Sequence, residues 1–256
     1  MQGIRIGADE GIHGVAWRWS AVGLLCLLLA STGVQAGMGG IGNATVNQGD
    51  FATQLRFSVS DDDQSAGLDG RFRNRLMLDY GISDDVALGF YIQGDNRGGD
   101  NQELDAFILD ARYELAQVAT DGYYTGFRLR YTYKDGDKKP DNFHIRLIAG
   151  LPVDQWDFRI NQILAYQVGE DSAGGLGVDT RLQASYRFHP DHRAGLESFS
   201  NFGFGSGSSF DEQAHTLGPI FAGKIAPGLS YEAGYRYGLS DAAADHTLRV
   251  FLAWLL

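Results

Sequence analysis

The chain has 256 residues, of which 35 are glycine, only 5 are proline and 12% are aromatic. This composition is typical of a β protein with many turns, and it argues against a helix bundle or a disordered chain. The formal net charge of -11 argues against a nucleic-acid-binding surface, so we expect no nucleic acid among the partners. The length allows one large domain or two small ones.

The first 36 residues have the pattern of a secretory signal peptide. A basic region that includes Arg18 precedes an apolar run over residues 21–30, which is too short to span a bilayer. Small residues around Ala36 fit a cleavage site. We therefore predict a signal peptide over residues 1–36 and a mature domain over 37–256. An uncleaved anchor is the alternative left open, and the acidic residues of the first region leave the true start codon open.

The single cysteine, Cys26, lies inside the predicted signal peptide. The mature domain would then contain no thiol, which excludes disulfides and cysteine-based metal sites. We expect no cofactor and no metal.

From residue 50 onward the main signal is an alternation with period two, which predicts β-strands. Residues 123–134 are the clearest case. Their odd positions are mostly aromatic or aliphatic, whereas their even positions include Gly126, Arg128, Arg130 and Lys134. Charged and apolar residues interleaved in this way cannot form a strand that is buried in protein on both faces.

The alternation predicts about twelve strands, each near the roughly 9–11 residues that a tilted strand needs to cross a bilayer. An even strand number is the rule for bacterial outer-membrane barrels. The expected spans are 50–59, 70–80, 85–94, 104–116, 122–134, 142–151, 154–168, 176–188, 193–203, 213–224, 228–238 and 246–255.

The connections between these segments alternate in length. Odd-numbered ones, such as 135–141 and 204–213, are long and polar, whereas even-numbered ones, such as 82–84 and 226–228, are short. Long loops at one end and short turns at the other are typical of outer-membrane barrels.

The strand pattern also fits a soluble sandwich or lipocalin-like barrel, in which the apolar face points inward. Three features favour the membrane: the export signal, a C-terminal strand that ends flush with the chain, and aromatic residues near strand ends. These aromatic residues are Phe51, Tyr80, Tyr113, Tyr123, Trp156, Tyr166, Phe188, Tyr237 and Trp254. We therefore predict an all-β fold, a closed antiparallel transmembrane β-barrel of about twelve strands, in the cell outer membrane.

The last forty residues resemble small Gram-negative outer-membrane porin or transporter-like proteins. The resemblance rests on residues 214–223, 231–240 and 249–256, and on the final alternation of Leu248, Val250, Leu252, Trp254 and Leu256. Members of that group typically end in such a strand closed by an aromatic residue, which resembles the signal read by the barrel-assembly machinery. Here the terminal residue is Leu.

No position carries a family-specific catalytic motif, so we expect that the protein is not an enzyme. The partners that the resemblance implies are the lipid bilayer with its lipopolysaccharide, the barrel-assembly machinery and a small-molecule solute. It does not specify which solute.

With the apolar face against lipid, the interior is expected to be basic although the whole chain is acidic. A charge on the lipid face would cost about 2–4 kcal/mol near the bilayer midplane. The residues that we expect along an anion pathway in the lumen are Arg56, Arg71, Arg73, Arg75, Arg128, Arg130, Arg146 and Arg249.

Part of the interior is expected to be held by cross-strand ion pairs. Hairpin pairing puts Asp110 opposite Arg128 and Asp157 opposite Arg187, each within one register step. Closure of the barrel puts Arg249 beside Arg56 and the arginines of the second strand. In that sector Asp79 is the only acid expected nearby, and the next strand offers small or uncharged residues. We therefore expect a passive channel for small anionic solutes.

Two other functions stay open. Ion pairs could fill the interior, which would give a non-conducting structural or binding barrel. Some outer-membrane barrels are lipid hydrolases, and His246 near Ser240 lies at the expected height, but no nucleophile motif accompanies it.

Overall fold

The computed structural model describes residues 38–63, 68–96, 101–135, 140–169, 172–205 and 209–256. The chain divides into two compact units, residues 1–32 and 33–256, and the fold described below belongs to the second. The predicted signal peptide, residues 1–36, lies outside the described residues.

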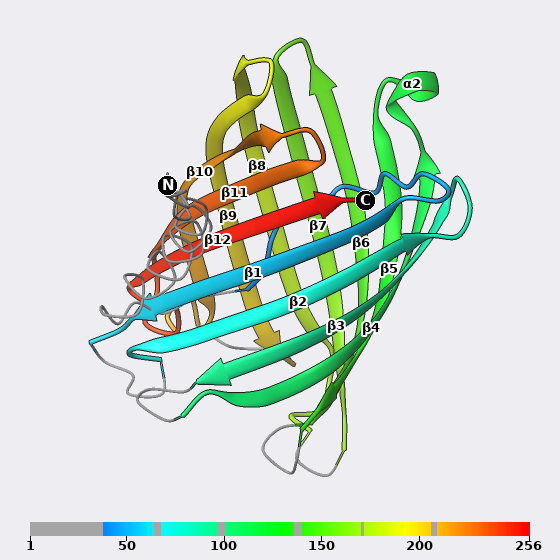
Figure 1. The fold of residues 1–256 in the computed structure, drawn as a ribbon. Coiled ribbons are helices and arrows are strands. Elements are labelled where there is room, and N and C mark those ends of the chain that lie inside the picture. Colours follow the sequence, from blue (N-terminus) through cyan, green and yellow to red (C-terminus); the bar gives the residue numbers. More distant parts are fainter. Residues whose placement is uncertain (1–37, 64–67, 97–100, 136–139, 170–171, 206–208) are drawn as a thin grey trace, which may run out of the picture. The chain divides into compact units, whose positions relative to one another are not determined.

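The second unit is built almost entirely of antiparallel strands, which Figure 1 shows wrapped into a barrel. Their bounds are β1 Phe51–Asp61, β2 Arg71–Gly81, β3 Val86–Asn96, β4 Glu103–Ala116, β5 Tyr124–Lys134, β6 Asp141–Val153, β7 Trp156–Val168, β8 Gly177–His189, β9 His192–Phe204, β10 Ala214–Ala226, β11 Leu229–Gly238 and β12 His246–Leu255. The prediction of twelve strands is confirmed.

The barrel closes through pairing of its first and last strands, as expected. β1 pairs with β12 from Ala52 opposite Leu255 to Asp61 opposite His246, and every other strand pairs with its sequence neighbours. Closure leaves no strand edge unpaired, which a bilayer requires because lipid offers no hydrogen bonds to free backbone groups.

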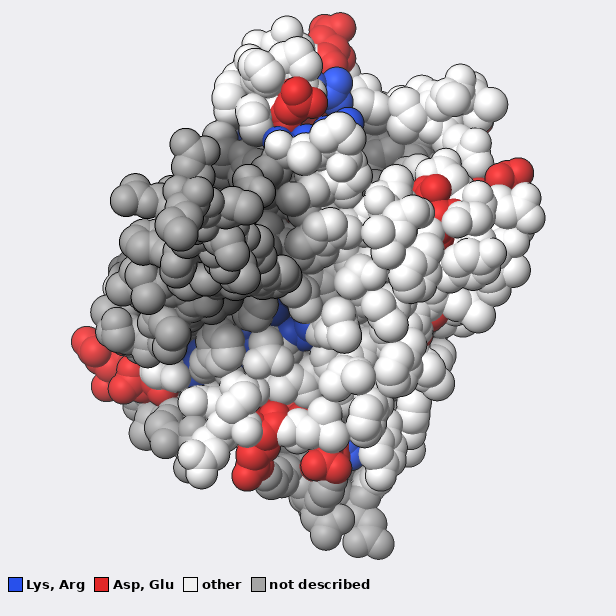
Figure 2. Space-filling model, viewed as in Figure 1, with Lys and Arg blue, Asp and Glu red and all other residues white. Residues whose placement is uncertain are grey.

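The outward face of the wall is apolar. Large hydrophobic side chains are exposed on every strand, among them Leu109, Leu147, Leu182 and Leu217. On the face seen in Figure 2, the side chains of the wall are mostly uncharged and acidic residues gather towards its rims. The predicted reversal of polarity relative to a water-soluble barrel is therefore confirmed.

Aromatic side chains line the ends of the strands on this outer face. Trp156 stacks on Phe158 with ring centroids 5.9 Å apart and contacts Tyr186 at 5.1 Å. Tyr113 stacks on Phe127 at 5.5 Å. Such girdles mark the two interfaces of a membrane barrel, where an amphipathic ring meets both lipid and water.

The two ends of the barrel differ in their connections. One end, called here the short-turn end, carries β6–β7, β8–β9 and β10–β11 turns of two residues, and the helix α2, Val118–Asp121, in the β4–β5 connection. The other, long-loop end carries the longer odd-numbered connections. In the β10–β11 turn Gly228 adopts a φ of 74°, a left-handed conformation that favours glycine. Among the described residues no helix is long and apolar enough to cross a bilayer.

A bulge in β4 breaks the simple alternation of side chains. Gln93 of β3 pairs with Ala106 and Gly94 pairs with Leu104, so Asp105 is the extra residue. Both Asp105 and Ala106 are buried as a result, because a bulge re-aims the side chains next to it. A strict period of two would have placed Asp105 on the outer face.

Candidate functional site

The inward face of β9, β11 and β12 carries a closed network of charges centred on Glu197. Its carboxylate accepts hydrogen bonds from Arg236 Nε at 3.1 Å and from Arg249 Nε at 2.9 Å. Arg249 also reaches Glu232 Oε1 at 2.6 Å and has no exposed surface. Gly234 lies beside it, where an added Cβ would come within 2.8 Å of Arg249 Nε. The prediction that Arg249 lacks acidic partners is therefore wrong.

A second network joins β3, β4 and β5. Asp110 lies 2.9 Å from Arg128 Nε and 2.8 Å from Arg130 Nε. The Tyr91 hydroxyl is 2.9 Å from both Asp79 and Asp110. Tyr91 is fully buried, and an added Cβ at Gly89 would lie 2.7 Å from its hydroxyl oxygen, so Tyr91 fills the space beside that glycine.

A third network lies nearer the long-loop end. Arg71 pairs with Asp95, and Arg73 Nε lies 3.4 Å from the same carboxylate. Lys134 Nζ is 2.6 Å from Asp105. The expectation that Arg71 and Arg73 lack a nearby acid is wrong, because β3 extends further than predicted and brings Asp95 into the barrel wall.

Asp157 has partners other than the predicted Arg187. It pairs with Arg159 on its own strand and lies 3.3 Å from Arg193 of β9. Its register partner on β8 is Ser185 and not Arg187. The two strands are therefore paired two residues away from the predicted register. Arg187 instead lines an open cavity of about 290 Å³ at the short-turn end, together with Arg193, Glu232 and Gln54.

Other inward cations lack a carboxylate partner in the part of the chain that the structure describes. Arg56 and Arg75 lie directly opposite each other on β1 and β2. Arg75 donates to Gln93 Oε1 at 3.0 Å, and Arg56 donates to Gln54 Oε1 at 2.6 Å. Arg56 also lies over the Phe251 ring, 4.3 Å from its centroid. Like charges directly opposite each other are destabilising unless something compensates for them.

Arg128 belongs to a cross-strand row of three arginines. It pairs in register with Arg112 of β4 on one side and with Arg146 of β6 on the other. Arg146 is buried. Among the described residues, Asp110 is the carboxylate bound to this row, through Arg128. The interior therefore holds a patch of positive charge from β1 to β6 that its own carboxylates neutralise only in part.

The segment before β1 lies inside the barrel, which the sequence did not predict. Met38, Ile41, Ala44 and Val46 are buried. The backbone of Gly42 bonds to an inward side chain of β7, and an added Cβ on Gly126 of β5 would approach Ala44 within 2.7 Å. We call residues 38–46 the inner segment.

The residues of the hydrolase alternative are engaged elsewhere. His246 Nδ1 lies 2.6 Å from the Tyr235 hydroxyl, and Ser240 Oγ donates to the Gln213 carbonyl at 2.5 Å. The backbone N–H of His215 donates to Ser240 Oγ at 2.9 Å. Within the described ranges, no three His, Cys, Asp or Glu side chains are grouped closely enough to hold a metal ion.

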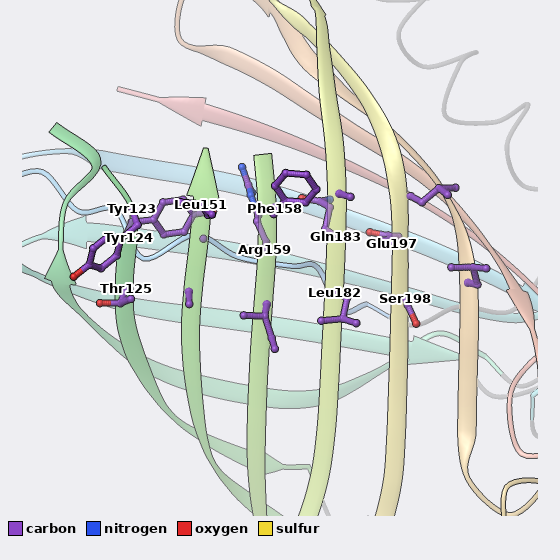
Figure 3. Close-up of a pocket in the computed structure, with 16 residues that line it drawn as sticks. Tyr123, Tyr124, Thr125, Leu151, Phe158, Arg159, Leu182, Gln183, Glu197 and Ser198 are labelled. Atoms are coloured by element: carbon purple, nitrogen blue, oxygen red, sulfur yellow. The ribbon is translucent and has the colours of Figure 1, made fainter. Parts of the chain in front are cut away.

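A concavity of about 710 Å³ lies on the outer wall. Figure 3 shows its lining residues in one band across adjacent strands, among them Leu151, Phe158 and Leu182. Small outward residues, Thr125, Ala149, Ala184 and Ser198, leave the space, and exposed aliphatic and aromatic side chains border it. An apolar groove that faces outward suits acyl chains and not a polar solute.

Closure, an apolar exterior with aromatic ends and a charged interior together define the class of outer-membrane β-barrels. The solved structures agree with this class. The KdgM porin superposes with a TM-score of 0.58 at 10% identity, over 79% of this chain and 98% of that chain. The NanC porin has a TM-score of 0.55 at 10% identity, covering 81% and 99%.

An outer membrane channel from Pseudomonas putida F1 has a TM-score of 0.63 at 12% identity, over 86% of this chain and 100% of that chain. No protein-family model and no curated protein sequence matches this chain. The structural likenesses therefore establish the fold, that of porin-type outer-membrane barrels, and the expected general resemblance to such proteins is confirmed.

Proposed function

We propose that this protein is a passive outer-membrane channel for small anionic solutes. The short-turn end faces the periplasm and the long-loop end faces the cell exterior, as in other barrels of this class. The observation that carries the proposal is the pair Arg56 and Arg75, which face each other across two strands with amide and carbonyl oxygens as their hydrogen-bond acceptors. An anion that passes would supply the missing negative charge.

The neighbouring arginines extend this pair into a pathway. Arg73, Arg128, Arg130 and Arg146 occupy inward positions of β2, β5 and β6. Arg71 and Arg249, with their buried carboxylate partners, hold the wall together. Guanidinium groups match carboxylate and phosphate geometry with two parallel donors, so these two anion types are the expected solutes.

One structural neighbour has an anionic sugar in its description. The KdgM porin has been solved in complex with a disordered oligogalacturonate, a chain of sugar carboxylates, and this structure has a TM-score of 0.55 at 9% identity. We infer that an organic anion of similar chemistry is a reasonable first solute to test on this chain.

Reversal potentials across a planar bilayer under a salt gradient test the proposal. Native protein should show anion preference, and Arg75→Gln should lower it. A unit charge about 8 Å from a passing ion in water changes its energy by about 0.5 kcal/mol, or roughly twofold in occupancy. Arg75→Lys, which keeps the charge, is the matched control. A cation preference in native protein would contradict the proposal.

A non-conducting barrel is the second candidate, and the inner segment is the observation that favours it. If residues 38–46 and the three ion-pair networks close the interior permanently, no variant of the wall should conduct. Any conductance measured for the native protein, however small, would favour the channel over the non-conducting barrel.

A further inference from the structure

The inner segment is held by scattered side-chain contacts and belongs to no strand of the barrel. The N–H of Gly42 donates to Asn161 Oδ1 at 3.0 Å, and Asn161 Nδ2 donates back to the Gly42 carbonyl at 3.1 Å. The N–H of Val46 donates to Glu114 at 2.8 Å. Without a backbone ladder, these contacts can break while the barrel stays intact.

One end of this segment is firmly attached to the wall. The N–H of Gly49 donates to the Gly81 carbonyl and the N–H of Gly81 donates to the Asp50 carbonyl, both at 2.9 Å. These bonds lie at the short-turn end, where the chain enters β1. The segment therefore has a fixed anchor at one end of the barrel and reaches the interior with its other end.

The interior end of the segment occupies arginines of the barrel wall. Arg56 Nη1 donates to the Met38 carbonyl and Arg181 Nη1 donates to the Gly40 carbonyl, both at 3.3 Å. Arg236 donates to the Gly39 carbonyl. Arg181 also pairs with Asp179 and Arg236 with Glu197, whereas Arg56 has no carboxylate partner among the described residues. The Met38 carbonyl thus takes an acceptor position on Arg56 that a solute carboxylate could fill with two parallel hydrogen bonds.

Two glycines in the inner segment let its backbone lie against these guanidinium groups. At Gly39 an added Cβ would come within 2.4 Å of Arg181 Nη1, and at Gly40 it would come within 3.0 Å of the Phe251 ring. Glycine at both positions brings the backbone carbonyls close to the arginines, and it leaves little side-chain bulk to obstruct withdrawal.

We propose that the inner segment is a gate that anionic solutes displace, because its carbonyls and the solute compete for the same arginines. This inference rests on the channel function proposed above and names its regulation. In the resting state the segment bonds to Arg56, Arg181 and Arg236, of which Arg56 is the one without a carboxylate partner among the described residues. A solute carboxylate or phosphate takes over the Arg56 donors, and the segment swings about its anchor near Gly49.

Single-channel recording on the full mature chain tests the gate. Deletion of residues 38–46 should raise the conductance several-fold and abolish closures. Asn161→Ala, which removes both bonds to Gly42, should raise the ratio of open to closed time about tenfold, equivalent to about 1.4 kcal/mol. Asn142→Ala is the matched control, because that inward amide bonds to the Pro140 carbonyl and not to the segment.

Addition of a solute to the native channel provides the second test. Galacturonate should raise the open fraction of the native channel, and neutral galactose should not.

The outcomes separate this inference from the channel function. Equal conductance of the native and deleted chains would overturn the gate and leave the channel. Equal open fractions with galacturonate and with galactose would overturn the competition for arginines. Absence of conductance in every variant, including the deletion, would overturn the channel function itself.

Discussion

Arg249 and Arg75 belong to the same barrel interior, yet their surroundings differ in how their charge is compensated. Arg249 bonds to two carboxylates, Glu197 and Glu232, and is fully buried. Arg75 bonds to an amide oxygen and faces the like charge of Arg56. The comparison separates two situations of one residue type: a compensated arginine is placed to stabilise the wall, and an uncompensated one is placed to attract the anions of the proposed channel function.

The largest effect on stability is expected when a carboxylate is removed from the buried network around Glu197. Glu197→Gln keeps the shape of the side chain but leaves Arg236 and Arg249 without their shared charge. Removal of one partner from a buried ion pair typically costs about 3–5 kcal/mol, and we expect a loss of about 3 kcal/mol in the free energy of unfolding. The shift from folded to unfolded mobility in gels after incubation in urea measures it.

A control on the same strand distinguishes charge from side-chain packing. Ser198→Ala changes an outward neighbour of Glu197 and should leave the unfolding transition in place. If Glu197→Gln unfolds at the same urea concentration as native protein, the buried network does not stabilise the wall, and the contrast with Arg75 disappears.

Arg75→Gln is expected to change the free energy of unfolding in the opposite direction to Glu197→Gln. Its removal relieves the repulsion with Arg56, which for charges directly opposite in a sheet amounts to at most about 1 kcal/mol. The unfolding free energy should therefore stay constant or rise slightly, while the anion preference falls. The same urea series measures stability, and reversal potentials on the same preparation measure selectivity.

A marked loss of stability in Arg75→Gln would show that this arginine is also structural. Arg75→Lys separates the two possibilities, because it retains the charge while it loses the planar guanidinium that donates to Gln93. If the Lys variant keeps both stability and selectivity, charge alone is the required property.

Most of the fold could be predicted from the sequence because it depends on a local pattern. Alternation of apolar and charged residues along 123–134 fixes which side chains face lipid, and the pattern repeats in every strand. The even strand number, the closure of β1 on β12 and the difference between the two ends all follow from the spacing of such segments. The observed strand bounds, such as Phe51–Asp61 for β1, lie within a few residues of the expected ones.

Partners from strands that are not hairpin neighbours could not be predicted in the same way, because hairpin pairing does not bring them together. Glu197 of β9 binds Arg249 of β12, which lies three strands away around the barrel. The bulge at Asp105 changes the face of a single residue, and no period shows it. The inner segment has no periodicity, since residues 37–42 are mostly glycine, so only its contacts in the folded barrel reveal its position.

The smallest expected effect comes from converting an uncompensated arginine into a compensated one. Gln54 Oε1 accepts the Nε–H of Arg56 at 2.6 Å, so Gln54→Glu places a carboxylate on that arginine with almost no change in size. We expect the anion preference to fall by roughly twofold, as for loss of one charge about 8 Å from the ion path. Reversal potentials measure this change. Stability should not fall, because the new carboxylate lies beside two facing cations. An unchanged anion preference would show that Arg56 does not contribute to the pathway, and selectivity would then depend on Arg75 and the row around Arg128.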